Sequence, residues 1–311
     1  MKRFLMASVL GCSVLSVVGC GSEESSQEAS AASQEHENVV LTTFYPTAYF
    51  ARRISGGLVP VDCPVPEGED PIFWQPGREA LERYRNAKLI VINGAQFEKW
   101  AIHASLPSSR IVNSAGAFKS EFIRYDTGIT HSHGAAGEHS HEGIDGHTWL
   151  DPIRAITQAE AIAEGMSEAW PEHADAFATN LTELARDLTE LDNAFKAMTP
   201  KLEGVKLLAS HPAYNYLADR YGWSITNLDL DPDEGVSAEA MEEIAAAIGN
   251  HEGRTILLWE SEPSDSGFVG RFTNVYFSPA ELPGTGPEPL SPDYLEIMQA
   301  NIQRLESALD Q

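Results

Sequence analysis

One stretch in the middle of the chain constrains the fold more than any other. Between residues 172 and 198, apolar side chains recur at alternating intervals of three and four residues: Ala174, Phe177, Leu181, Leu184, Leu188, Leu191, Phe195 and Met198. Because an α-helix has about 3.6 residues per turn, this spacing places all of them on one stripe of a single helix. At about 1.5 Å per residue, such a helix is roughly 40 Å long. Pro171 stands at its start and Pro200 just beyond its end, as helix termini favour.

The apolar stripe has to be covered, and two arrangements are open. One is a coiled coil with a partner helix, and the other is a single helix that lies against two flanking lobes. We favour the second arrangement, because the pattern lasts fewer than four heptads and the sequence on each side contains apolar runs that can form a lobe. Such a helix would be a strut that limits hinge opening between the lobes.

Both flanks of this helix alternate short apolar runs with amphipathic stretches. Before it, we expect strands and helices in alternation, with strands at 39–44, 59–65, 88–93 and 110–113 and helices at 46–55, 78–86 and 97–103. After it, we expect strands at 205–210, 223–228, 255–260 and 274–278 and helices at 212–221, 237–249 and 293–309. Strands separated by helices form parallel sheets, so the pattern predicts two parallel-sheet α/β lobes joined by one long rigid helix.

The first twenty residues, MKRFLMASVLGCSVLSVVGC, have the form of a secretory signal. Lys2 and Arg3 precede an apolar run that is too short for a comfortable membrane span, which needs about 20 apolar residues. Cys20 at the end of the run fits a bacterial lipoprotein signal, cleaved before Cys20 and lipidated on its thiol. The alternative is an ordinary signal peptide in which Cys20 is incidental.

These features predict the layout of the whole chain. Residues 21–38 are rich in Ser, Glu, Gln and Ala, and we expect them to form a solvated tether. The predicted segments are a lipoprotein signal peptide at 1–19, a disordered tether at 20–38, an N-terminal lobe at 39–170, a connecting helix at 171–200 and a C-terminal lobe at 201–311. The protein is then extracytoplasmic and anchored by lipid to the cell membrane, at its periplasmic face or outer surface.

The charge balance excludes one class of partner. The chain has 46 Asp and Glu against 21 Lys and Arg, which gives a formal net charge of −25. Nucleic-acid-binding proteins need a basic face, so nucleic acid is not the partner. An acidic protein tolerates cations nearby, and this one also carries ten histidines. Neutral imidazoles are good ligands for zinc, copper and nickel.

Residues 131–147 hold five of the ten histidines together with four glycines. We expect this segment to be a flexible loop without a single defined site. Its first four histidines have no rigid element behind them and would bind metal weakly and variably. They are possible ligands only: His131, His133, His139 and His141.

Three other side chains are better fixed. His147 precedes the sequence Thr-Trp-Leu-Asp-Pro, whose aromatic and apolar residues can anchor it in a core. His211 follows the strand VKLLAS, and Glu260 ends the strand TILLWE, with Glu262 two residues further on. In parallel α/β sheets, ligands gather outside the carboxyl ends of the strands. The three positions are therefore candidates for one metal site.

Several stretches together resemble the metal-binding lipoproteins of bacterial zinc and manganese ABC importers, the ZnuA- and TroA-like group. They run in order over residues 39–311 and read VVLTTFYPTAYFARRISGG, VPEGEDPIFWQP, KLIVING, GHTWLDP, LLASHPAYNYLADRYGW and TILLWESEP. The resemblance implies two α/β lobes, one long connecting helix and a metal in the cleft between the lobes. It also implies that His147 and His211 are metal ligands. The acid at the end of the strand TILLWE is the third ligand, which we place at Glu260 because Glu260 directly continues the strand.

The chain departs from the family pattern at the first ligand loop. Family members usually read Asp-Pro-His there, whereas this chain has Ile72 in place of the histidine, after Asp70 and Pro71. Isoleucine cannot bind a metal, so we expect an oxygen ligand from Asp70 or from water. Glu69 and a histidine of the loop are other candidates. A His, His, Glu set with one open position is of the kind found in catalytic zinc sites.

We therefore expect a monomeric receptor that captures Zn²⁺ and hands it to an ABC permease and its ATPase, without catalytic turnover. Zinc is favoured over Mn²⁺ because two imidazoles and a histidine-rich loop suit the softer ion. One alternative is a zinc hydrolase that uses the same His/His/Glu set, although the chain has neither HExxH nor GxSxG. Another is a manganese-binding, adhesin-type or metal-buffering lipoprotein on the same fold.

Overall fold

The structure is a computed structural model. It describes residues 38–125, 129–132, 138–141, 143–230, 237–262, 267–282 and 290–310, with the backbone only at 129–132, 138–141 and 267–269. The predicted signal peptide, Cys20, nearly all of the predicted tether and His133 lie outside the described residues. No helix within the described ranges is both long enough and apolar enough to cross a bilayer.

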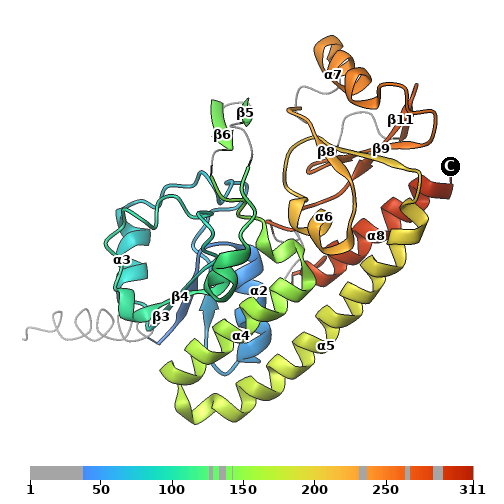
Figure 1. Ribbon diagram of the computed structural model, residues 1–311. Helices are drawn as coiled ribbons and strands as arrows, with labels where there is room; N and C mark the ends of the chain where they lie inside the picture. The colour runs from blue at the N-terminus through green and yellow to red at the C-terminus, as the bar shows by residue number, and fades with distance from the viewer. Residues whose placement is uncertain are drawn as a thin grey trace, which may run out of the picture.

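Two α/β lobes are joined by one long helix, α5 (Ala174–Met198), as Figure 1 shows. The N-terminal lobe contains β1 (Val40–Thr42), α2 (Tyr45–Ser55), β2 (Val61–Asp62), α3 (Arg78–Asn86), β3 (Leu89–Ile92), β4 (Ile111–Asn113), β5 (Ile129–Ser132), β6 (Glu138–His141) and α4 (Pro152–Ala169). The C-terminal lobe contains β7 (Lys206–Ala209), α6 (Asn215–Tyr221), β8 (Ile225–Asn227), α7 (Ala238–Ile248), β9 (Thr255–Trp259), β10 (Gly267–Val269), β11 (Phe272–Tyr276) and α8 (Tyr294–Asp310). The predicted fold class is confirmed.

The sheet of the N-terminal lobe has the strand order β2-β1-β3-β4, and all of its neighbouring strands are parallel. Alternate residues of a strand point to opposite faces, so each strand supplies two cores. Val40 and Val91 join the main core with helices α2 and α4. Leu41 and Ile90 join a second core with Tyr84 of α3. The sheet is therefore covered on both faces, as parallel sheets require.

The sheet of the C-terminal lobe has the order β10-β11-β9-β7-β8, in which only the edge strand β10 is antiparallel to its neighbour. Leu207 and Ile256 belong to the main core together with α5 and α8. Leu208 and Leu257 point the other way and pack with Ile244 of α7. The strands β7, β9 and β11 are parallel, so their carboxyl ends lie at one edge of the sheet.

Helix α5 covers both lobes with its apolar stripe. Side chains along its whole length, from Phe177 to Met198, belong to one core cluster that includes residues of both sheets. The helix packs against α2 and α4 of the N-terminal lobe and against α8 of the C-terminal lobe. Because the stripe is buried within the chain itself, the interpretation as a strut between lobes holds and a coiled-coil partner is not needed. Residues 171–173 form a separate short helical turn before α5 begins.

Several expected elements differ from the structure. The helix expected at 97–103 is wrong: this segment forms turns, after Ala95 and Gln96 adopt left-handed backbone conformations with φ of 50° and 64°. The buried carboxylate of Glu98 then accepts hydrogen bonds from the backbone N–H groups at the end of β3, which fixes the turn. The strand expected at 59–65 shortens to β2, since the prolines that follow cannot donate to a ladder.

The histidine-rich segment also departs from the expected irregular loop. Its described backbone forms an antiparallel ribbon of β5 and β6, in which His131 pairs with His139 and Ile129 pairs with His141. The ribbon stands between the two lobes in Figure 1. Ile129 and Thr130 are β-branched residues, which favour strands in spite of the glycines nearby.

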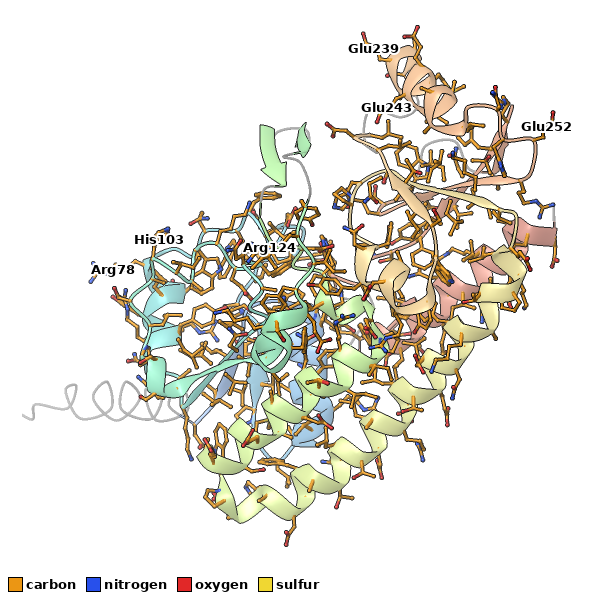
Figure 2. The ribbon with its side chains drawn as sticks, viewed as in Figure 1. Arg78, His103, Arg124, Glu239, Glu243 and Glu252 are labelled. Atoms are coloured by element: carbon orange, nitrogen blue, oxygen red, sulfur yellow. The ribbon has the colours of Figure 1, made fainter. Side chains whose placement is uncertain are left out.

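The excess of acidic residues is carried largely by the surface. Figure 2 shows Glu239, Glu243 and Glu252 projecting outward from the C-terminal lobe, and all three residues are exposed. These carboxylates are solvated rather than gathered into a site.

Candidate metal centre

His147 is held rigidly in the N-terminal lobe. Its backbone N–H and its ring Nδ1 both contact Asp145 Oδ1, at 2.9 Å and 2.7 Å. The ring also packs against Trp149, with 5.4 Å between ring centroids. His147 is 2% exposed and Asp145 is fully buried. Since Nδ1 is occupied by a carboxylate, the ring presents its other nitrogen, Nε2, to the site.

His211 occupies the corresponding place in the C-terminal lobe. It lies two residues beyond the end of β7 and is 4% exposed. Its Nδ1 contacts the carboxylate of Glu260, which directly follows β9. Strands β7 and β9 are neighbours, with Ala209 paired to Leu258, so the two side chains leave the sheet together. His211 and Glu260 thus lie at the carboxyl ends of neighbouring parallel strands, where the sequence led us to expect them.

The two imidazoles meet between the lobes. The ring centroids of His147 and His211 are 5.7 Å apart, and the rings are inclined at 71°. Each imidazole has a buried or half-buried carboxylate at its Nδ1, Asp145 on one side and Glu260 on the other. Two histidines that are far apart in the sequence are therefore brought together, each in contact with a carboxylate of its own lobe.

Glu281 is a third member of the site that the sequence patterns did not indicate. Its Oε1 lies 3.1 Å from His147 Nε2, and its side chain is only 15% exposed. It follows β11 after a bend in which Ala280 has a positive φ of 56°. The sequence could have indicated Glu281 only by its position after a predicted strand. Strand β11 is parallel to β9, so its carboxyl end lies beside Glu260.

The electrostatics of His147 are dominated by this setting. Burial is the largest single effect and lowers the pKa of His147, yet Asp145 and Glu281 together raise it to about 10. A metal ion that binds at Nε2 therefore has to displace a proton. Within the described part of the chain, His147 Nε2 has no well-aligned hydrogen-bond partner, in spite of its closeness to Glu281.

A zinc ion fits between His147 Nε2 and Glu281 Oε1. Zinc–nitrogen and zinc–oxygen bonds of about 2.0–2.1 Å at a tetrahedral angle place the two ligand atoms about 3.3 Å apart. The observed 3.1 Å is close to that value. No group of three or more His, Cys, Asp and Glu side chains in the described ranges is arranged to hold a metal as it stands. His147 Nε2 and Glu281 Oε1 face each other, so zinc has to replace the proton between them.

Hydrogen bonds between the lobes hold the site closed on one side. Asn215 Nδ2 donates to Asp145 Oδ2 over 2.9 Å, and Tyr216 Oη donates to the backbone oxygen of Asp145 over 3.0 Å. Trp149 Nε1 donates to the backbone oxygen of Pro279 over 2.7 Å. These contacts tie the loop of His147 to α6 and to the segment that carries Glu281, so the position of each ligand candidate depends on the other lobe.

The remaining candidates are placed differently. Asp70 Oδ1 accepts a hydrogen bond from the backbone N–H of Ile72 over 2.8 Å and so stabilises the turn of that loop. Ile72 packs against the main core, while Glu69 and Glu262 are exposed. The side chains of the histidines in β5 and β6 and the whole of His133 lie outside what the structure describes.

Fold and site together define a class: two-lobed binding proteins in which a long helix joins the lobes and imidazoles from both lobes meet between them. A family model described as ZnuA, zinc-uptake complex component A, periplasmic, matches residues 40–308. The match covers most of the chain, and the chain belongs to this family. The resemblance found in the sequence is confirmed, as is the expectation that the protein is not an enzyme.

Individual relatives agree with this assignment. The high-affinity zinc uptake system protein ZnuA of Bacillus subtilis is 28% identical over 326 residues, which cover 99% of this chain and 98% of that protein. The zinc-binding lipoprotein AdcA of Streptococcus pneumoniae is 25% identical over 282 residues, which cover 88% of this chain and 56% of that protein. The chain thus spans little more than half the length of AdcA.

Solved structures share the fold. The metal-dependent lipoprotein YcdH of Bacillus subtilis superimposes with a TM-score of 0.72 at 22% identity, covering 88% of this chain and 98% of YcdH. Zn(II)-bound AdcA of Streptococcus pneumoniae gives 0.71 at 21% identity, covering 88% and 58%. The protein FpvC of Pseudomonas aeruginosa, solved with Mn²⁺, gives 0.64 at 19% identity, covering 88% and 99%.

Proposed function

We propose that this chain is an extracytoplasmic solute-binding protein that captures Zn²⁺ and delivers it to an ABC permease and its ATPase. The observation that carries the proposal is the meeting of two buried imidazoles from opposite lobes, with ring centroids 5.7 Å apart. A metal bound there bridges the lobes, so the loaded and empty proteins differ in how the lobes are held. A permease can distinguish the two states by that difference.

In this proposal the metal is bound by His147 Nε2, by His211 and by Glu281. Asp145 and Glu260 lie behind the imidazoles: Asp145 accepts a hydrogen bond from His147 Nδ1, and the carboxylate of Glu260 contacts His211 Nδ1. In this proposal each carboxylate fixes its ring and makes it a better donor. This assignment gives Glu260 an orienting role, and it gives Glu281 the position of carboxylate ligand. Its support is the 3.1 Å separation of Glu281 Oε1 from His147 Nε2.

Zinc is the proposed cargo rather than manganese. Two imidazoles and one carboxylate are a ligand set that zinc accepts readily, whereas manganese favours sites richer in oxygen. The description of the family and the names of the relatives from Bacillus subtilis and Streptococcus pneumoniae point the same way. FpvC has this fold and was solved with Mn²⁺, so the preference for zinc rests on the donor set and not on the fold.

The proposed location follows from the N-terminus. Cleavage before Cys20 and lipidation of its thiol would anchor the protein outside the cytoplasm, with residues 20–38 as the tether to the N-terminal lobe. The protein is proposed to act as a monomer, because the stripe of α5 is already covered by the chain's own two lobes.

Titration of the metal-free protein with Zn²⁺ against a competing chelator tests the proposal. The expected result is one tight site per chain, weakened more than about 100-fold in both His147→Ala and His211→Ala. His103→Ala is the matched control, because His103 is exposed on the N-terminal lobe and points outward in Figure 2. Unchanged zinc affinity in both site variants would refute the proposal.

A further inference from the structure

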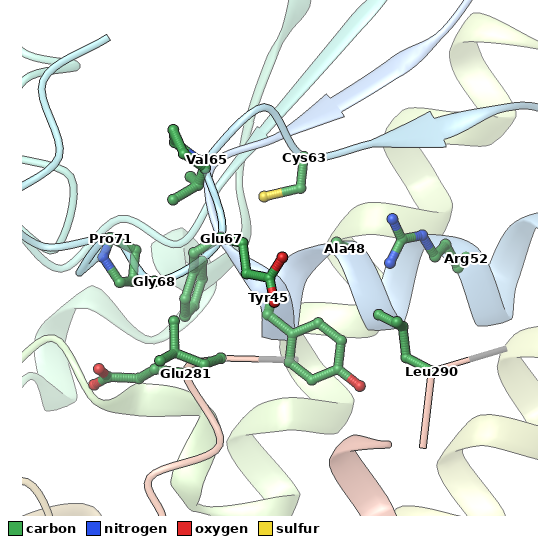
Figure 3. A pocket seen from close by; sticks show the side chains of 13 residues that line it. Tyr45, Ala48, Arg52, Cys63, Val65, Glu67, Gly68, Pro71, Glu281 and Leu290 are labelled. Carbon is green, nitrogen blue, oxygen red and sulfur yellow. The ribbon is translucent and has the colours of Figure 1, made fainter. Parts of the chain in front are cut away.

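A cavity of about 470 Å³ lies directly beside the candidate metal centre. One wall is formed by α2 and the loop after β2, and the other by Glu281, Leu282 and Leu290 of the C-terminal lobe. Figure 3 shows Glu281 and Arg52 at opposite sides of this space, with Tyr45 and Ala48 between them. The volume lies within the range of about 300–1,000 Å³ that small-molecule sites occupy.

One end of the cavity adjoins the metal centre through Glu281. Glu281 lines the cavity and also lies 3.1 Å from His147 Nε2, so a metal held by these two residues sits at the cavity wall. His147, His211 and Glu281 supply three donors, whereas zinc prefers four ligands in a tetrahedron. The open fourth position is therefore within reach of a molecule in the cavity.

The opposite end carries the guanidinium of Arg52. Arg52 lines the cavity and forms no ion pair with any described side chain, whereas its neighbour Arg53 is paired with Asp187 at 2.6 Å. Free arginines are unexpected in a chain with 46 acidic and 21 basic residues. A guanidinium on a cavity wall is suited to a carboxylate, which it can bind through two parallel hydrogen bonds.

The walls between the two ends define the rest of the ligand. Phe44, Ala48 and Leu290 provide apolar surface, and the carboxylate of Glu67 lies on the same cavity. Glu67 has no ion-pair partner among the described side chains and can accept an ammonium group. Apart from Glu281, which the metal engages in this proposal, the cavity presents one anion and one cation to the same occupant, which is complementary to a zwitterion.

We propose that this cavity binds a small zwitterionic ligand of the amino-acid class together with the metal. A nitrogen or oxygen donor of its side chain fills the fourth zinc position beside Glu281, its carboxylate pairs with Arg52 and its ammonium pairs with Glu67. The inference rests on the proposed function, since it needs zinc at His147 and Glu281. The cargo is then a zinc complex rather than the bare ion.

Equilibrium dialysis with radiolabelled L-histidine tests the inference, with zinc supplied at one equivalent and zinc content measured on the same samples. Histidine is the probe because it combines an imidazole donor with the zwitterion. Zinc-loaded protein is expected to retain about one equivalent of histidine, and metal-free protein much less. Histamine lacks only the carboxylate and is expected to bind at least tenfold more weakly.

The variants separate this inference from the proposed function. Arg52→Gln is expected to lower histidine retention at least tenfold while zinc retention without histidine is unchanged. Arg53→Gln, one residue away and outside the cavity, is the matched control and should retain histidine. If zinc is held but histidine is not, or if histidine strips zinc from the wild-type protein, this inference is overturned and the proposed function stands. If zinc is not retained with or without histidine, the proposed function itself fails.

Discussion

Replacing Asp145 with asparagine should change how zinc affinity depends on pH, and not only how strong the affinity is. Asp145 contacts His147 Nδ1 at 2.7 Å, and among the groups that raise the pKa of His147 it acts most strongly. Asparagine has nearly the same shape and can still accept from the backbone N–H of His147. The substitution therefore removes a charge with little change in packing.

The expected size follows from the pKa of about 10 for His147 in the metal-free protein. Below that pH each zinc ion displaces one proton from this ring, so the apparent affinity rises about tenfold per pH unit. From pH 6 to pH 9, His147 alone contributes a rise of about 1,000-fold. Without Asp145, Glu281 alone opposes the effect of burial, so the pKa of His147 falls and the rise levels off at lower pH.

A second effect acts in the opposite direction. The carboxylate orients the imidazole and increases its basicity, and loss of such an outer-shell partner weakens metal binding about 10–100-fold. At pH 9 the Asp145→Asn protein is therefore expected to bind zinc about 10–100-fold more weakly than the wild type. The difference should narrow as pH falls, because the variant has less proton competition to overcome.

The assay is a zinc titration against a chelator of known proton dependence at each pH from 6 to 9. Asp219→Asn is the matched control, since that carboxylate is 61% exposed. Equal slopes of log affinity against pH in the wild type and in Asp145→Asn would show that Asp145 does not control the protonation of His147. The account of the electrostatics would then be wrong.

Three further substitutions probe separate parts of the structure. Glu281→Gln should weaken zinc binding more than about 100-fold, whereas Glu262→Gln, at an exposed position, should leave it within about twofold; equal effects would remove Glu281 from the ligand set. Glu260→Gln should cost about 10–100-fold, as an orienting residue does, and a loss as large as that of Glu281→Gln would make Glu260 a ligand. Leu188→Ala, at a fully buried position of α5, should lower the free energy of unfolding by about 2–5 kcal/mol in urea with zinc stoichiometry unchanged; a loss below about 1 kcal/mol would contradict the packing of the strut.

The main features of the fold could be predicted because they depend on local periodicity. The apolar stripe of α5 and the alternation of strands and helices can each be recognised within a single segment of the sequence. Each pattern is also repeated often enough to be unambiguous. The proximity of His147 and His211 could also be predicted, for a related reason. Parallel strands end at the same edge of a sheet, so a residue just after a buried strand is placed by the sheet and not by its own sequence.

Glu281 shows where this reasoning ends. The strand before it was expected at 274–278 but runs from Phe272 to Tyr276, and a bend with a positive φ at Ala280 separates it from the glutamate. Nothing in the local sequence states how far this bend returns the chain toward His147. The same limit applies to the turn after β3, where Ala95 and Gln96 adopt left-handed conformations that their residue types do not favour.

The central claim is that zinc is held by one imidazole from each lobe. X-ray absorption spectroscopy at the zinc edge counts the imidazoles bound to the ion and so tests this claim directly. We predict two imidazoles and oxygen donors in the wild-type protein, and one imidazole in each of His147→Ala and His211→Ala. With zinc as the only added ligand, three or more imidazoles in the wild type, or a count that neither variant changes, would contradict the account.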